Sequence, residues 1–149
     1  MRKILSIDGG GIRGIIPSLL LDYLEGQTGK PIAELFDLCV GTSSGGITAL
    51  GLAQQDEVGR PKYSAHDLAA FFENSGAKIF KKTVWRNIRS AGGVLDELYS
   101  AKPLEGALRK YYGRTRLGDT LGSTMVTTYD IEARRTLFLK SWHPDHEDG

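Results

Sequence analysis

The sequence has little of several features that define large classes of protein. It holds one cysteine among 149 residues, so no disulfide can form within the chain. That residue, Cys39, lies inside an apolar run, which favours a small buried side chain over a redox or nucleophilic one. No apolar run approaches the roughly 20 residues of a membrane span, and the first residues lack the pattern of a signal peptide. We therefore expect a cytoplasmic protein.

An excess of charge of one sign is also missing. The formal net charge is +1, which gives no reason to expect a nucleic acid as a partner. The composition is that of an ordinary globular domain, with 40% hydrophobic and 25% charged residues. The chain shows no internal repeat, low-complexity segment or linker, so we expect residues 1–149 to belong to one domain with a real core.

Short apolar runs alternate along the chain with segments of helical periodicity. The strand-like runs are 3–7, about 36–40, 124–131 and 136–140, and the helical segments are 15–27, 32–35, 44–54, 64–80 and 103–112. At the start of one helix, Ser64 and Asp67 have the spacing of a capping box, with Asp in place of Glu. This alternation predicts an α/β fold with a largely parallel sheet and helices on both faces.

A Gly-x-Ser-x-Gly turn follows the second apolar run, and a helical segment begins directly after it. Gly41 and Gly45 flank Ser43, and the order of strand, sharp turn and helix exposes the central serine at the apex. A serine hydroxyl becomes a useful nucleophile when it is exposed, fixed and close to a base. We therefore predict Ser43 as the nucleophile and interpret Ser44 as a residue that starts the helix.

A second glycine-rich stretch, Asp8 to Gly14, follows the first strand-like run. Successive backbone N–H groups in such a turn form a cradle for an anion, which could be a phosphate or the oxyanion of a tetrahedral intermediate. Asp8 could cap the turn, and Arg13 could hold the loop or a lipid phosphate; a purely structural turn with an arginine salt bridge is the alternative. Because both motifs follow strands, we expect them to meet at one sheet edge as the minimal apparatus of acyl transfer.

The paired motifs, 8–14 and 41–46, resemble those of the patatin-like phospholipase family, and the resemblance covers most of the chain. It implies a three-layer α/β/α fold and hydrolysis of acyl esters of phospholipids or other lipids, in lipid catabolism or signalling, without a metal or other cofactor. On this pattern Ser43 is the nucleophile of a Ser–Asp dyad, Gly10 and Gly11 offer oxyanion N–H groups, and Arg13 helps to hold the lipid phosphate.

One part of the family's pattern is missing. Its third motif, Asp-Gly-Gly or Asp-Gly-Ala, carries the general base, and no such tripeptide follows Ser43. Asp148-Gly149 comes after a charged stretch with no strand to position it, so we do not expect Asp148 to be the base. We instead expect the chain to be the amino-terminal portion of the domain, incomplete at its C-terminus, with a nucleophile whose partner is absent.

The histidines offer an alternative, since α/β-hydrolases also use Gly-x-Ser-x-Gly, with Asp and then His downstream. His143 and His146 come late enough in the chain, but they lie in a Pro- and acid-rich stretch for which a solvated loop is the better interpretation. The same cluster lacks a recognised metal-ligand spacing. His66, close to a helix start, is expected to be exposed and structural.

A basic segment with large apolar residues lies at 78–89. Basic residues among Trp, Phe and Ile suit an anionic membrane surface, so peripheral contact with a membrane is one hypothesis; an ordinary surface segment packed on the domain is the other. The residues that would make the contact are Lys78, Lys81, Lys82, Trp85, Arg86 and Arg89.

Two further functions remain as alternatives to the hydrolase. An actin-like kinase also has a first strand that ends in Asp-Gly-rich sequence, but a Thr usually follows the glycines there, and this chain has Ile12 and Arg13. The Gly-x-Ser-x-Gly turn would also be unexplained. The second alternative is a non-catalytic fragment that binds lipid. The sequence does not indicate an oligomeric state.

Overall fold

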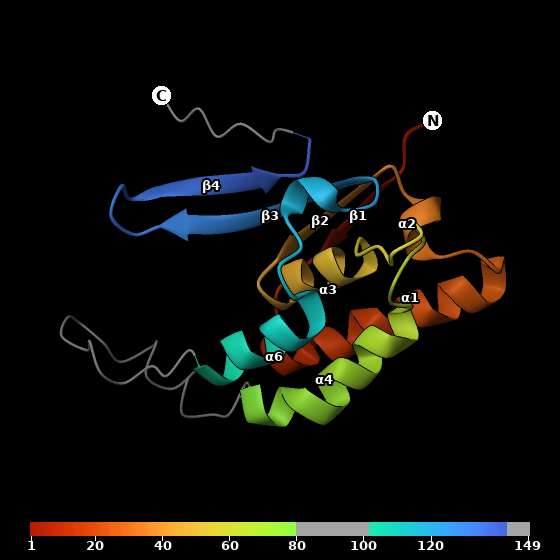
Figure 1. The fold of residues 1–149 in the computed structure, drawn as a ribbon, viewed down its shortest axis with the longest axis horizontal. Coiled ribbons are helices and arrows are strands. Elements are labelled where there is room, and N and C mark those ends of the chain that lie inside the picture. The colour runs from red at the N-terminus through yellow and green to blue at the C-terminus, as the bar shows by residue number, and fades with distance from the viewer. Residues whose placement is uncertain (80–101, 143–149) are drawn as a thin grey trace.

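The computed structural model describes residues 1–79 and 102–142. In these ranges a four-stranded sheet has the order β1-β2-β3-β4 (Figure 1). The strands are β1 (Ile4–Ile7), β2 (Leu38–Thr42), β3 (Ser123–Asp130) and β4 (Arg135–Lys140). The helices are α1 (Ile15–Thr28), α2 (Ile32–Leu35), α3 (Ser44–Leu52), α4 (Ala65–Ile79) and α6 (Lys102–Tyr112), with short 3-10 helices η1 (Gly11–Gly14) and η2 (Leu117–Asp119). The expected α/β fold with a mostly parallel sheet is confirmed.

The register of the parallel strands aligns the two glycine-rich motifs. β1 pairs with β2 so that Ile7 lies opposite Gly41, and β2 pairs with β3 so that Gly41 lies opposite Val126. The carboxyl ends of these strands therefore reach the same edge of the sheet, which is where ligands bind in open α/β sheets. Among the four described strands, only β4 runs antiparallel, as the second strand of a hairpin with β3.

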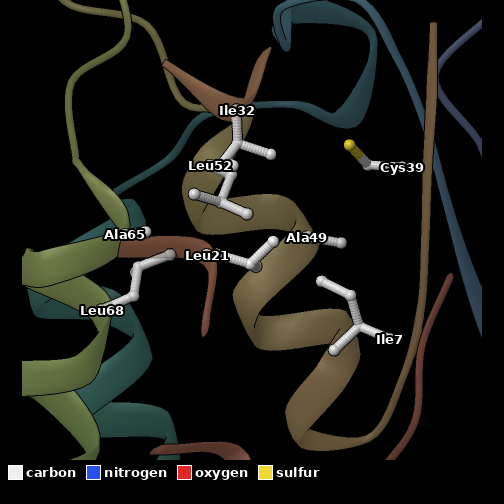
Figure 2. Packing of buried hydrophobic residues seen from close by; sticks show 8 residues of the cluster. All are labelled: Ile7, Leu21, Ile32, Cys39, Ala49, Leu52, Ala65 and Leu68. Atoms are coloured by element: carbon white, nitrogen blue, oxygen red, sulfur yellow. The ribbon is translucent and has the colours of Figure 1, made fainter. Parts of the chain in front are cut away.

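The alternating pattern predicts helices on both faces of the sheet, but in residues 1–79 and 102–142 the helices pack in two tiers on one face. α3 lies directly against the sheet, and α1, α4 and α6 lie beyond α3 (Figure 1). Because α3 is sandwiched in this way, nearly all of its residues are buried, and small residues allow the close approach. The core spans both tiers (Figure 2), and its buried members are Ile7, Leu21, Ile32, Cys39, Ala49, Leu52, Ala65 and Leu68.

Apolar side chains remain exposed on the parts of the described structure that face away from this core. Successive strand residues point to opposite faces, and Ile4 in β1 is 63% exposed. A stripe on α1 is also more than half exposed; it consists of Ile16, Leu19, Leu20 and Tyr23. No helix in residues 1–79 or 102–142 is both long enough and apolar enough to cross a membrane.

Most element boundaries match the expected ones to within two residues, and two details explain how ends are set. The capping box is present: Ser64 N–H and Oγ–H both donate to Asp67 Oδ2, at 2.8 and 2.7 Å. α3 ends at Leu52, two residues earlier than expected, because Gln54 N–H donates to the Gly51 carbonyl in an i→i+3 turn.

Candidate active site

Ser43 lies at the sharp turn between β2 and α3. Its backbone has φ 55° and ψ −122°, a positive φ that non-glycine residues rarely adopt. The residue is exposed, while Ser44 and the two glycines that follow are buried. The turn is so tight that a β-carbon on Gly41 would lie 2.2 Å from the Gly45 carbonyl oxygen. The predicted strand, turn and helix therefore place Ser43 at an exposed apex.

The loop after β1 is packed directly against this turn. A β-carbon on Gly9 would lie 2.9 Å from both Ser43 Cβ and the Thr42 carbonyl oxygen. A β-carbon on Gly45 would lie 2.0 Å from the carbonyl oxygen of Ile7. Side chains at Gly9 and Gly45 would therefore hold the two motifs apart, and the glycines allow their backbones to touch. The expectation that the motifs meet at one sheet edge is confirmed.

A hydrogen bond joins the two motifs as well. Gly10 N–H donates to Ser44 Oγ at 2.9 Å, and Ser44 is fully buried. Gly11 is also buried and has a positive φ of 60°. In the part of the chain that the structure describes, Gly11 N–H has no hydrogen-bond acceptor. The two glycines predicted as oxyanion donors thus differ, since one N–H is engaged within the protein and the other is not.

The start of α3 adds to the electrostatics of the site. The first N–H groups of a helix lack partners within the helix and carry a partial positive charge. Ile47 N–H donates to the Ser43 carbonyl at 3.1 Å, so the first turn of α3 begins at the predicted nucleophile. The site therefore combines an exposed hydroxyl with a helix N-terminus and a glycine loop, and the last two are features that can stabilise a developing oxyanion.

Comparison with known proteins agrees with this geometry. The family model for patatin-like phospholipases matches residues 5–145. The chain belongs to the patatin-like phospholipase family. It is 35% identical over 149 residues to patatin-T5 of Solanum tuberosum, which covers 95% of this chain and 36% of that protein. Patatin-like protein 2 of Oryza sativa subsp. japonica is 37% identical over 150 residues, or 94% of this chain and 37% of the rice protein.

A second rice relative, patatin-like protein 1 of Oryza sativa subsp. indica, is 35% identical over 134 residues. That match covers 86% of this chain and 32% of the relative. The chain thus spans about a third of the length of these patatin relatives. Membership of the patatin-like family leaves the actin-like kinase alternative without support.

A groove runs from the glycine loop of this patatin-like chain along α1. It has a volume of about 610 Å³ and lies between β1 and α1. Asp8, Gly9, Gly10 and Arg13 line its end at the loop, and the rest is lined mostly by apolar residues such as Leu20, with Ser6 among them. Arg13 is exposed, and its backbone N–H donates to the Gly10 carbonyl at 3.2 Å. The side chain of Arg13 is thus available to a ligand at the loop.

The titratable residues that the structure describes supply no evident base for Ser43. No side chain in the described ranges is hydrogen-bonded to Ser43 Oγ. Asp148, His143 and His146 lie outside the described residues, so their predicted roles are untested. His66 is exposed, as expected, and its Nδ1 lies 3.2 Å from Asp22 Oδ2.

Two other predictions concern cysteine and metal chemistry. Burial raises the pKa of the Cys39 thiol to about 11, so the thiol is neutral and the interpretation as a small buried side chain holds. Within residues 1–79 and 102–142, no three His, Cys, Asp or Glu side chains gather in a way that could hold a metal ion.

The basic segment is mostly outside the described structure. Lys78 lies in α4 near its end, and the other five predicted membrane contacts fall within residues 80–101. The membrane hypothesis therefore stays a prediction.

Sequence reasoning missed the hydrogen bond to Ser44. That residue does begin α3, as expected, but its side chain also reaches the loop after β1. Ser44 and Gly10 are 34 residues apart, and no local pattern links them. The available signal was weaker: a small polar residue directly after the predicted nucleophile, at a position that the tight turn forces into the interior.

Proposed function

We propose that this chain carries the nucleophile and the oxyanion-binding loop of a lipid acyl hydrolase. The observation that supports this most strongly is the packing of Gly9 against Ser43, with 2.9 Å between Ser43 Cβ and a β-carbon built on Gly9. That contact supports the proposal, because the loop that carries the N–H groups packs against the residue that would attack. Membership of the patatin-like phospholipase family supports the same assignment.

The proposed reaction begins when Ser43 Oγ attacks the carbonyl carbon of an acyl ester and its proton passes to a base. The carbonyl oxygen becomes an oxyanion, which the loop N–H groups and the start of α3 stabilise. Collapse of the intermediate expels the alcohol, which takes up the proton, and leaves an acyl group on Ser43. Water then attacks the acyl-enzyme, releases the fatty acid and restores the serine.

The base in this proposal is an aspartate, as the partner of Ser43 in a Ser–Asp dyad. The described residues hold no side chain bonded to Ser43 Oγ, so we propose that the carboxylate comes from outside them. Without a base to accept its proton, a serine hydroxyl is a weak nucleophile. Without that carboxylate, Ser43 is therefore expected to react slowly even though its turn and loop are formed.

The proposed substrate is a phospholipid or another acyl-ester lipid. Arg13 stands where the apolar groove meets the loop, and a guanidinium suits a phosphate oxygen through charge-assisted hydrogen bonds. We also propose peripheral contact of a cytoplasmic protein with anionic membranes through the basic segment. Replacement of Lys81, Lys82 and Arg86 by Glu should then weaken binding to anionic vesicles and leave binding to neutral vesicles unchanged; equal binding to anionic vesicles would contradict the contact.

A fluorophosphonate probe tests the hydrolase proposal, because it reacts with an activated serine and mimics the tetrahedral intermediate. We expect slow labelling of the folded chain that is abolished in Ser43→Ala. Ser123→Ala is the matched control, since Ser123 begins β3 at the opposite edge of the sheet and should label as the unchanged chain does. A folded chain that is not labelled would favour a non-catalytic lipid-binding fragment.

A further inference from the structure

The side chain of Ser44 is buried and has a specific partner in the other motif. It is 0% exposed, and its Oγ accepts a hydrogen bond from Gly10 N–H at 2.9 Å. Buried hydroxyl groups in proteins are normally hydrogen-bonded, because an unpaired one loses its bonds to water without replacement. The Ser44 hydroxyl is therefore stable in the interior because it accepts the hydrogen bond from Gly10 N–H.

Gly10 is hydrogen-bonded through both of its backbone polar groups. Its N–H donates to Ser44 Oγ. The Gly10 carbonyl accepts from Arg13 N–H at 3.2 Å, which closes η1. Gly10 is thus fixed at its N–H by α3 and at its carbonyl by its own loop. The glycine contacts described above bring the loop and the serine turn together, but they are steric and limit distance only. The hydrogen bond from Gly10 to Ser44 in addition fixes how the peptide groups of the loop are rotated.

We propose that Ser44 is a positioning residue that orients the loop after β1, residues 8–14, for binding of the oxyanion. In this arrangement Gly11, and not Gly10, offers its free N–H to the oxyanion. This inference rests on the proposed hydrolase function. The Gly10 N–H is occupied by Ser44 Oγ, whereas the buried Gly11 N–H has no acceptor among the described residues. Among the described residues, a backbone N–H of the loop beside Ser43 that has no protein acceptor remains able to donate to a ligand.

The helix that carries Ser44 also supplies a matched control. Thr48 lies one turn further along α3, is 0% exposed like Ser44, and donates from Oγ1 to the Ser44 carbonyl at 3.1 Å. Ser44→Ala and Thr48→Val each remove one buried hydroxyl from α3. Only Ser44→Ala removes the bond to Gly10, so a difference between the two variants reports on the loop and not on general loss of packing.

The first experiment measures fluorophosphonate labelling of Ser43 and separates reversible binding of the probe from the rate of phosphonylation. Leaving the part-buried Gly10 N–H without its acceptor costs up to about 1–3 kcal/mol, and a loss of that size in transition-state stabilisation equals roughly 5- to 150-fold in rate. We expect Ser44→Ala to slow phosphonylation about 10-fold or more with little change in reversible binding, and Thr48→Val to change the rate less than about 3-fold. Ser44→Thr, which keeps the hydroxyl, should restore most of the rate. Equal slowing in Ser44→Ala and Thr48→Val, or none in either, would overturn the inference.

The second experiment does not depend on reactivity. In nitrogen-15 NMR spectra of the unchanged chain, the Gly10 amide should have the small temperature coefficient of a hydrogen-bonded N–H, and Gly11 should not. The Gly10 coefficient should become large in Ser44→Ala and stay small in Thr48→Val. If the unchanged chain is not labelled at all, the proposed function fails while these spectra still decide the bond; a Gly10 amide without hydrogen-bond character in the unchanged chain would refute the positioning role directly.

Discussion

The backbone conformation of Ser43 leads to the prediction that its replacement by glycine stabilises the protein while abolishing its chemistry. At φ 55° and ψ −122°, Ser43 occupies a region that a β-carbon makes unfavourable. Such a conformation costs about 1–3 kcal/mol in a non-glycine residue. Ser43→Gly removes that strain at once, because glycine has no β-carbon to collide with the neighbouring backbone.

The expected gain is smaller than the strain itself. Glycine loses more conformational entropy on folding than other residues, which costs about 0.5–1 kcal/mol. The middles of these two ranges differ by about 1 kcal/mol, so the free energy of unfolding of Ser43→Gly should exceed that of the unchanged chain by about that amount. For a chain of this length each kcal/mol raises the midpoint of thermal unfolding by about 2–4 °C.

Ser43→Ala separates the strain from the hydroxyl group. Alanine keeps the β-carbon and thus the strain, so its stability should stay within about 0.5 kcal/mol of the unchanged chain. Urea unfolding followed by circular dichroism measures all three proteins, and equal slopes against urea would show that the unfolded states are comparable. If Ser43→Gly is no more stable than Ser43→Ala, the turn is not strained and the reasoning is wrong.

Three further changes should have defined effects. Gly45→Ala should prevent stable folding, because its β-carbon would lie 2.0 Å from a carbonyl oxygen of β1. Gly26→Ala is the contrasting change: a β-carbon there meets no atom within 4 Å, so this variant should raise the free energy of unfolding by about 0.5–1 kcal/mol. Chemical denaturation compares the two variants. Cys39 should react slowly with a thiol reagent at pH 8, and fast labelling of the folded protein would contradict this. Because the pKa of Cys39 in the folded protein is raised from 9.0 to about 11, the free energy of unfolding should fall as the pH rises from 9 towards 11. Ser64→Ala should destabilise the start of α4 by about 1 kcal/mol. The hydrogen bonds from Ser64 lower the pKa of Asp67, so the unchanged chain should lose this stabilisation in acid as the Asp67 carboxylate is protonated. Unfolding curves of both proteins from pH 7 to 2 would detect the loss.

Local patterns were enough to predict much of this fold. The strand, turn and helix around Ser43 follow from the glycines at 41 and 45, and the start of α4 follows from the spacing of Ser64 and Asp67. These features depend on residues a few positions apart, whose conformational limits can be read directly. The parallel pairing of β1 with β2 was also implied by the strand-helix-strand order.

Other features depend on contacts between distant parts of the chain and could not be predicted. The placement of the helices in two tiers on one face of the described sheet is decided by how α3 packs, and no local pattern records it. The division of work between Gly10 and Gly11 is a similar case. Both look alike in a run of glycines, and they differ only because Ser44, 34 positions later, bonds to one of them.

The close backbone contacts between the two motifs also bear on how such a site could be inherited or transferred. Gly9 meets the serine turn, and Gly45 meets the end of β1, so each motif is shaped to the main chain of the other. A recombination event with a breakpoint between residues 14 and 41 would join halves that had not been fitted to each other. Anyone who moves the serine turn into a different sheet must therefore move the adjacent strand end and its glycines with it, because the transferable unit is the pair of strands.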